Sequence, residues 1–183
     1  KGGVGKTTLT ANLAYALAKK GSRVLIFDGD LGMANVDIHF GTRSEGSIAD
    51  VLNGEKEISE VVCEVAPQIS LIPGGSGLVE LNRLSSFQRR ALLESISEID
   101  YKFDYLLIDT APGISDNVLY LNSAAQVCTV VITPDPSSLT DSYALIKVMN
   151  QEFKRTRFSI VCNQVKDEVE ATALFNRFND VVN

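Results

Sequence analysis

The chain begins with a glycine-rich segment, KGGVGKTT over residues 1–8, and a helical pattern follows it directly over residues 6–20. Glycines at positions 2, 3 and 5 leave room for several backbone N–H groups to converge on one bound anion. The start of the helix adds the positive end of its dipole at the same place. A glycine-rich turn that only caps the helix is the alternative. The segment therefore predicts a phosphate-binding loop between a strand and a helix.

The segment matches the P-loop pattern GxxxxGK[ST] if one glycine precedes Lys1, with Gly5, Lys6 and Thr7 in the last three places. In that pattern Lys6 neutralises charge on the β- and γ-phosphates, and Thr7 offers its hydroxyl to Mg²⁺. Thr8 is placed to reach the α-phosphate. Backbone contacts to phosphate are expected from the other loop residues, which are Gly2, Gly3, Val4 and Gly5.

Short β-branched runs alternate with longer amphipathic segments along the chain, which predicts βα units. The short runs are apolar on both faces, as strands covered by helices on both sides are. Strands are predicted at 23–28, 69–73, 105–110, 127–133 and 158–163. Helices are predicted at 6–20, 47–52, 86–99, 115–125, 138–153 and 166–182, with Ser86 as the cap of its helix and Gly21 just after the first. We expect an α/β fold, P-loop NTPase-like, with a mostly parallel central sheet flanked by helices.

No linker, repeat or low-complexity segment divides the 183 residues, so a single P-loop domain over 1–183 is the simplest interpretation. A phosphate loop of this kind normally follows a strand, and no residue stands before Lys1. We expect the first strand and the C-terminal end of the domain to lie outside this sequence, as in a fragment of a longer protein.

Composition disfavours several classes of function. The chain has 17 lysines and arginines against 23 acidic residues, a net charge of −6, which argues against general binding to nucleic acid phosphates. The longest apolar runs are far shorter than the ~20 residues that span a bilayer. The three cysteines form no CxxC pair, so no zinc site or iron–sulfur cluster is indicated. Cys128 and Cys162 lie in apolar runs and are predicted to be buried, reduced thiols of a cytoplasmic protein.

Carboxylates follow two of the predicted strands, at the ends where ligands bind in an open parallel sheet. The strand at 23–28 continues as DGDLGMANVD from Asp28, and the strand at 105–110 continues as DTAPG from Asp109. An apolar strand that ends in a carboxylate is the Walker B arrangement, so Asp109 is predicted to hold Mg²⁺ through water. An ordinary acidic turn is the alternative for Asp28 and Asp30.

These motifs together resemble the deviant Walker A ATPases, a family that includes the MinD, ParA and FlhG/FleN proteins and the nitrogenase iron protein. The resemblance rests on Lys1 at the start of KGGVGKT, on DGDLGMANVD as switch I and on DTAPG as switch II. It implies ATP as the nucleotide, with Mg²⁺, and a Lys1 that crosses a dimer interface to the phosphates of the partner subunit.

The resemblance also implies roles for individual residues. Asp30 would orient the attacking water and sit near Mg²⁺, so that the catalytic residues are Lys1, Lys6 and Asp30 and the metal-binding residues are Thr7, Asp30 and Asp109. Asp28 would support the site. Gly113 would offer its N–H to the γ-phosphate, and Asn163 would recognise the adenine edge.

Several segments look closest to the FlhG/FleN branch: DLGMANVD, the stretch at 84–93, IDTAPGIS and, above all, TPDPSSLTDSYALIK at 133–147. The branch regulates flagellar number and placement as a switch in which ATP favours a dimer and slow hydrolysis dissolves it. The partners implied are a second copy of the chain, the flagellar GTPase FlhF, and basal-body or transcription-regulator proteins. A cytoplasmic protein is implied, which reaches the inner membrane only through segments outside this sequence.

Two other functions stay open at this point. A MinD- or ParA-type ATPase acts on division or DNA cargo, and DNA binding would use the basic cluster at Lys154, Arg155 and Arg157, which a solvated surface also explains. A metabolic P-loop enzyme or metallocluster carrier needs a substrate pocket or a cysteine pair, and the sequence has no such pair. Because the chain has a net charge of −6, nucleic acid is not expected as a partner.

Overall fold

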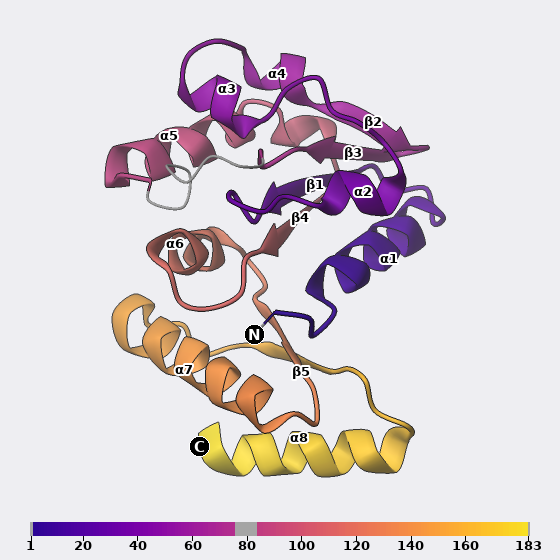
Figure 1. Cartoon of the computed structure of the whole chain (residues 1–183), viewed down its shortest axis with the longest axis vertical. Coiled ribbons are helices and arrows are strands. Elements are labelled where there is room, and N and C mark those ends of the chain that lie inside the picture. Colours follow the sequence, from indigo (N-terminus) through magenta and orange to yellow (C-terminus); the bar gives the residue numbers. More distant parts are fainter. Residues whose placement is uncertain (1, 76–83, 183) are drawn as a thin grey trace. The chain divides into compact units, whose positions relative to one another are not determined.

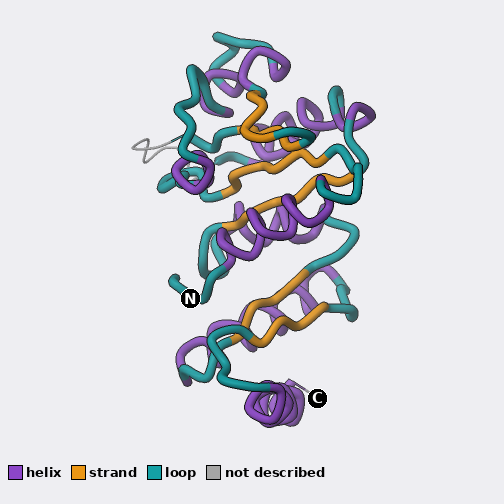
Figure 2. Tube along the Cα trace, turned by 90° about the vertical axis from the view of Figure 1, so that its right-hand side faces the viewer, coloured by secondary structure: helices purple, strands orange, loops and turns teal. Residues whose placement is uncertain are grey.

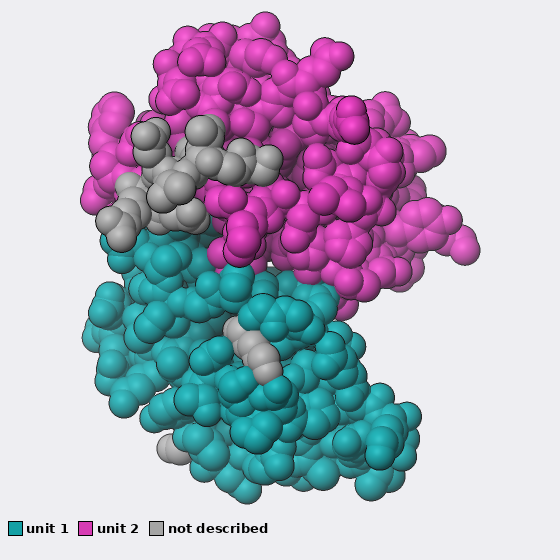
Figure 3. Space-filling view, viewed as in Figure 1, with its two compact units in different colours: residues 1–6, 112–183 teal, residues 7–111 magenta. Residues whose placement is uncertain are grey.

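The computed structural model describes residues 2–75 and 84–182, and the chain forms two compact units (Figure 3). Unit 2 is Thr7–Ala111. Unit 1 combines the N-terminal loop, which ends at Lys6, with Pro112–Asn183. Residues 2–6 of the predicted phosphate-binding segment therefore belong to unit 1, whereas Thr7, Thr8 and both predicted carboxylate sites belong to unit 2.

Unit 2 contains a four-stranded sheet in the order β2-β3-β1-β4 (Figures 1 and 2). The strands are β1 (Val24–Gly29), β2 (Cys63–Ala66), β3 (Ile69–Ile72) and β4 (Tyr105–Thr110). β1 pairs in parallel with both β3 and β4, and β2 pairs antiparallel with β3 at one edge. Every residue of β1 is buried, as expected for a central strand of a parallel sheet.

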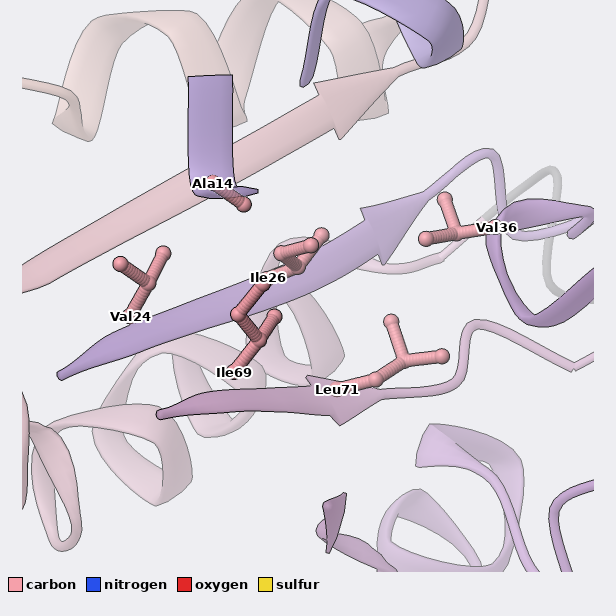
Figure 4. Close-up of a cluster of buried hydrophobic side chains, with 6 residues drawn as sticks. All are labelled: Ala14, Val24, Ile26, Val36, Ile69 and Leu71. Atoms are coloured by element: carbon pink, nitrogen blue, oxygen red, sulfur yellow. The ribbon is translucent and has the colours of Figure 1, made fainter. Parts of the chain in front are cut away.

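One face of this sheet carries the apolar core shown in Figure 4. Successive side chains of a strand point to opposite faces, so Val24 and Ile26 of β1 share a face, as Ile69 and Leu71 of β3 do. Ala14 of the first helix and Val36 of the second complete the buried cluster. Each large aliphatic side chain that is fully buried contributes ~1.5–3 kcal/mol, so this cluster is a main source of unit 2's stability.

The helices of unit 2 are α1 (Lys6–Ala18), α2 (Val36–Phe40), α3 (Ile48–Leu52), α4 (Ile58–Val61), α5 (Ser86–Ser97) and the 3-10 helix η2 (Asp100–Lys102). The first residue of α1, Lys6, is the last residue of the loop of unit 1. Gly21 follows α1 with φ of 90°, in agreement with its predicted place after the helix. The N-cap of α5 is Ser85 and not Ser86, because Ser85 and Gln88 exchange the two hydrogen bonds of a capping box.

Unit 1 contains the parallel pair β5 (Thr129–Ile132) and β6 (Ser159–Cys162) and the helices α6 (Asp116–Ala124), α7 (Pro136–Phe153) and α8 (Glu168–Val182). Its core joins Val130 and Ile132 of β5 to Ile146 of α7 and to Leu174 and Phe178 of α8. α7 begins with Asp135 as N-cap and a proline in its first turn, two local signals that start a helix at that point.

The strands and helices predicted from the sequence are all present, with ends within two residues of the prediction. α2, α4 and β2 were not predicted. The two helices have only five and four residues, too few to show a helical period. β2 is a short, half-exposed edge strand that includes Glu64, so it lacks the continuous apolar run of the other strands.

Two expectations from composition can be compared with the structure. No helix within 2–75 and 84–182 is both long and apolar enough to cross a membrane. All three cysteines are free thiols. The predicted burial is confirmed for Cys128 and wrong for Cys162, which is half-buried. Burial raises the pKa of the Cys128 thiol, which keeps it protonated and unreactive.

Candidate functional site

The glycine-rich loop at residues 2–5 leads into α1 at Lys6. Gly3 and Gly5 have φ of 76° and 96°, a region that residues with a Cβ seldom adopt. Val4, which lies between them, is buried. Glycines in this conformation turn successive N–H groups toward one side of the loop, where they form a concave anion-binding surface. The positive φ at Gly3 and Gly5 is the backbone feature that such a surface uses, and phosphate binding by the loop stays a prediction.

Two side chains that follow β6 hold this loop within unit 1. Asn163 donates its Nδ2–H to the carbonyl oxygen of Val4 at 2.8 Å. Gln164 donates its Nε2–H to the carbonyl oxygen of Gly3 at 3.0 Å. A Cβ added at Gly5 would overlap the Nδ2 atom of Asn163 and would displace that amide, and the φ of Gly5 also favours glycine. The sequence pointed to Asn163 as a base contact only, and no sequence signal indicated its bond to the loop.

Two buried carboxylates lie side by side in unit 2, because the register of β1 and β4 pairs Asp28 with Asp109. Asp28 is 1% exposed and Asp109 is 3% exposed. Burial raises the pKa of Asp28 to about 6, and the negative charge of Asp109 adds to the increase. Hydrogen bonds from backbone N–H groups oppose it without cancelling it. The strand-end position predicted for both residues is confirmed, and their pairing concentrates negative charge at this end of the sheet.

Asp28 also shapes the loop that carries Asp30. One Asp28 carboxylate oxygen accepts hydrogen bonds from the N–H groups of Asn35 and Val36, at 2.8 and 2.9 Å. The other oxygen accepts from the N–H of Asp30 at 3.2 Å. The side chain therefore spans the whole loop between β1 and α2. These three bonds fix the conformation of the loop, and the support for a nucleotide site that the resemblance implies for Asp28 stays a prediction.

The donors predicted for Mg²⁺ are Thr7, Asp30 and Asp109, all of which belong to unit 2. Hydroxyl and carboxylate oxygens are the hard ligands that Mg²⁺ takes, usually one or two from the protein, with water and substrate phosphates completing its shell. The described residues hold no group of three or more His, Cys, Asp or Glu side chains placed to bind a metal. By their chemistry these oxygen donors suit Mg²⁺, and their role as its ligands stays a prediction.

The basic cluster near the end of α7 has a structural explanation in part. The guanidinium of Arg155 donates to the backbone carbonyls of Ser123, Ala125 and Gln126 at the C-terminal end of α6. A cation at that end of a helix satisfies its last carbonyls and its dipole. Arg155 therefore has a structural role in unit 1. Of the predicted DNA-binding cluster, Lys154 and Arg157 do not take part in this interaction.

Comparison with known proteins then identifies the family. The family model described as "AAA domain" matches residues 1–161. The chain is 39% identical over 181 residues to the antiactivator FleN of Pseudomonas aeruginosa, an alignment that covers 99% of this chain and 65% of FleN. The chain belongs to the MinD/ParA-type P-loop ATPases. It is also 40% identical over 179 residues to the flagellum site-determining protein YlxH of Helicobacter pylori, with 97% of this chain and 60% of YlxH covered.

The solved structures agree with this family assignment. The septum site-determining protein MinD of Pyrococcus horikoshii, complexed with Mg-ADP, matches 100% of this chain and 74% of its own with a TM-score of 0.78 and 27% identity. The predicted α/β fold with a mostly parallel sheet, and the resemblance to FlhG/FleN, are confirmed. The chain spans less than two thirds of the length of FleN and YlxH.

Some of the site residues of this MinD/ParA-type ATPase keep the status of predictions. Lys1 lies outside the described residues, so its place at a dimer interface stays a prediction. Gly113 has φ of 97°, which explains the glycine in DTAPG but does not test its contact with a phosphate. The same holds for the nucleotide contacts of Lys6, Thr7 and Thr8, and for a single domain over residues 1–183.

Proposed function

We propose that this MinD/ParA-type ATPase is a nucleotide-dependent switch that regulates the number or placement of flagella. The observation that carries the proposal is the 39–40% identity, over nearly the whole chain, to proteins named as an antiactivator and as a flagellum site-determining protein. In the proposed cycle ATP favours a homodimer, slow hydrolysis to ADP and phosphate dissolves it, and partner proteins read the state. The proposed partners are the flagellar GTPase FlhF and basal-body or transcription-regulator proteins.

The glycine loop would bind ATP through the backbone of residues 2–5, with Lys6 at the β- and γ-phosphates and Thr8 at the α-phosphate. Phosphoryl transfer needs positioning and charge neutralisation more than covalent catalysis, so N–H groups and one lysine are suitable tools. Asn163 would meet the adenine edge. Lys1 would reach the phosphates of the partner subunit, which would make nucleotide binding and dimer formation depend on each other.

Thr7, Asp30 and Asp109 would hold Mg²⁺, which, when bound, neutralises phosphate charge during transfer. Asp30 would orient the attacking water. Its place in the chain supports that role, because the N–H of Asp30 is bonded to the carboxylate of Asp28 beside Asp109. Asp28 thereby sets the position from which Asp30 acts.

Steady-state phosphate release tests the catalytic part of the proposal. Asp30→Ala is expected to lower the turnover rate at least tenfold while ATP still binds, because the water loses its positioning group. Asp180→Ala is the matched control, since Asp180 is an exposed aspartate on α8 in unit 1. Unchanged hydrolysis by Asp30→Ala would remove Asp30 from the catalytic residues.

Binding to purified FlhF, measured by light scattering with ATP and with ADP, tests the flagellar part. An ATP-dependent complex with FlhF supports the flagellar assignment. If the ATP-bound protein does not bind FlhF, the flagellar assignment is rejected in favour of a MinD- or ParA-type role on division or DNA cargo.

A further inference from the structure

Asn163 and Gln164, which we call the amide strap, hold two successive carbonyl groups of the glycine loop. The Gly3 carbonyl accepts from Gln164 and the Val4 carbonyl accepts from Asn163, at 3.0 and 2.8 Å. Both contacts lie within unit 1. The two strap residues are adjacent in the chain, and so are the two carbonyls that they hold.

The backbone at Gln164 explains how neighbouring side chains reach the same loop. In an extended strand, successive side chains point to opposite faces. The N–H of Asn163 still donates to Ile132 of β5, so Asn163 continues the strand pairing of β6. Gln164 then turns into the left-handed region with φ of 58°, which few residues other than glycine adopt. After this turn, the side-chain amides of both Asn163 and Gln164 reach carbonyl groups of the glycine loop.

The strap has a direct consequence for the N–H groups of the loop. A trans peptide unit is planar, and its C=O and N–H point in opposite directions. The Gly3 carbonyl shares its peptide unit with the N–H of Val4, and the Val4 carbonyl shares its unit with the N–H of Gly5. Holding the two carbonyls therefore directs these two N–H groups to the opposite side, away from the strap.

We propose that Gln164 is a positioning residue for polyphosphate binding, which acts by holding the Gly3 carbonyl and so fixing the direction of the Val4 N–H. Asn163 does the same for the Gly5 N–H, in addition to any contact with the base. The proposal rests on the proposed function, since it assumes that the glycine loop binds nucleotide phosphates. It adds a residue that the P-loop pattern does not contain and that lies more than 150 positions away in the chain.

Gln164→Met is the informative variant, because methionine has a similar length and no N–H donor. Gln68→Met is the matched control, since Gln68 is an exposed glutamine with φ of 66° in the turn between β2 and β3. Calorimetric titration of the full-length protein with ADP and with inorganic tripolyphosphate compares a ligand that has a base with one that has none. Urea denaturation of the variants verifies that both fold.

Gln164→Met is expected to weaken binding of ADP and of tripolyphosphate by the same factor, about fivefold, the effect of one neutral hydrogen bond. Gln68→Met is expected to change neither affinity. Equal affinities for Gln164→Met and Gln68→Met would overturn the proposal, and so would a loss confined to ADP, which would assign Gln164 to the base site. If the unaltered protein binds neither ligand, the proposed function itself fails. If the unaltered protein, Gln164→Met and Gln68→Met all bind both ligands equally well, only the role of Gln164 fails.

Discussion

Gly5 meets two structural requirements at once, and replacing it by alanine tests both. Its φ of 96° is strained for any residue with a Cβ, and a Cβ there would overlap the Nδ2 atom of Asn163. That nitrogen donates to the Val4 carbonyl. Gly5→Ala is therefore expected to strain the loop and to displace the amide that holds it.

The left-handed conformation costs an L-residue ~1–2 kcal/mol, and the lost hydrogen bond costs ~1 kcal/mol more. Gly5→Ala is thus expected to lower the free energy of unfolding by about 2–3 kcal/mol. Gly21→Ala is the matched control, because Gly21 has φ of 90° and a Cβ there would meet no atom within 4 Å. Only the conformational cost of ~1–2 kcal/mol applies to it.

Urea denaturation of Gly5→Ala, Gly21→Ala, Asn163→Ala and the Gly5→Ala/Asn163→Ala double variant measures these terms. With the Asn163 amide removed, Gly5→Ala should cost no more than Gly21→Ala, about 1–2 kcal/mol. The reasoning is refuted if Gly5→Ala and Gly21→Ala cost the same, or if Gly5→Ala costs as much with Asn163 absent as with it present.

Two further predictions concern stability. Arg23 lowers the pKa of Asp104 through a bidentate ion pair. The ionised Asp104 therefore stabilises unit 2 at pH values above its unfolded-state pKa. This stabilisation is lost as the pH falls through the lowered folded-state pKa. Asp104→Asn should therefore lower the urea midpoint at pH 7, and the difference should shrink as the pH falls below the unfolded-state pKa, whereas a shift that does not change with pH would contradict the pairing. Arg155→Ala should destabilise the protein by about 1–2 kcal/mol, because three carbonyls at the end of α6 lose their donor. The exposed neighbour Arg157→Ala should stay within ~0.5 kcal/mol, and equal effects of the two variants would argue against a structural role for Arg155.

The sequence was sufficient for features that depend on nearby residues. Glycine spacing in KGGVGKTT predicts a loop that needs glycine, and the structure gives Gly3 and Gly5 a positive φ, which glycine adopts readily. Apolar runs that end in Asp28 and Asp109 predict strands with carboxylates at their ends, and the register of β1 and β4 brings these together. Such features are readable because one short segment contains all the residues that determine them.

The sequence was insufficient where distant segments meet. The bonds from Asn163 to Val4 and from Gln164 to Gly3 join residues about 160 positions apart, and an amide after a strand carries no signal of its partner. Arg155 looked like part of a basic surface because its charge is visible in the sequence, whereas the helix end that it caps is not. Sequence analysis uses residue types and the period of apolar residues. A tertiary contact of a single polar side chain changes neither of these, so it cannot be predicted from them.

In the proposed switch, bound nucleotide controls the association of this MinD/ParA-type ATPase with a second copy. Light scattering of the full-length protein with ADP, with ATP and Mg²⁺, and with ATP and Mg²⁺ in the Asp30→Ala variant measures this association. We predict the mass of a monomer with ADP, the mass of a dimer with ATP, and a dimer that persists in Asp30→Ala because hydrolysis no longer dissolves it. A monomer under all three conditions would contradict the switch and would favour a metabolic P-loop enzyme in its place.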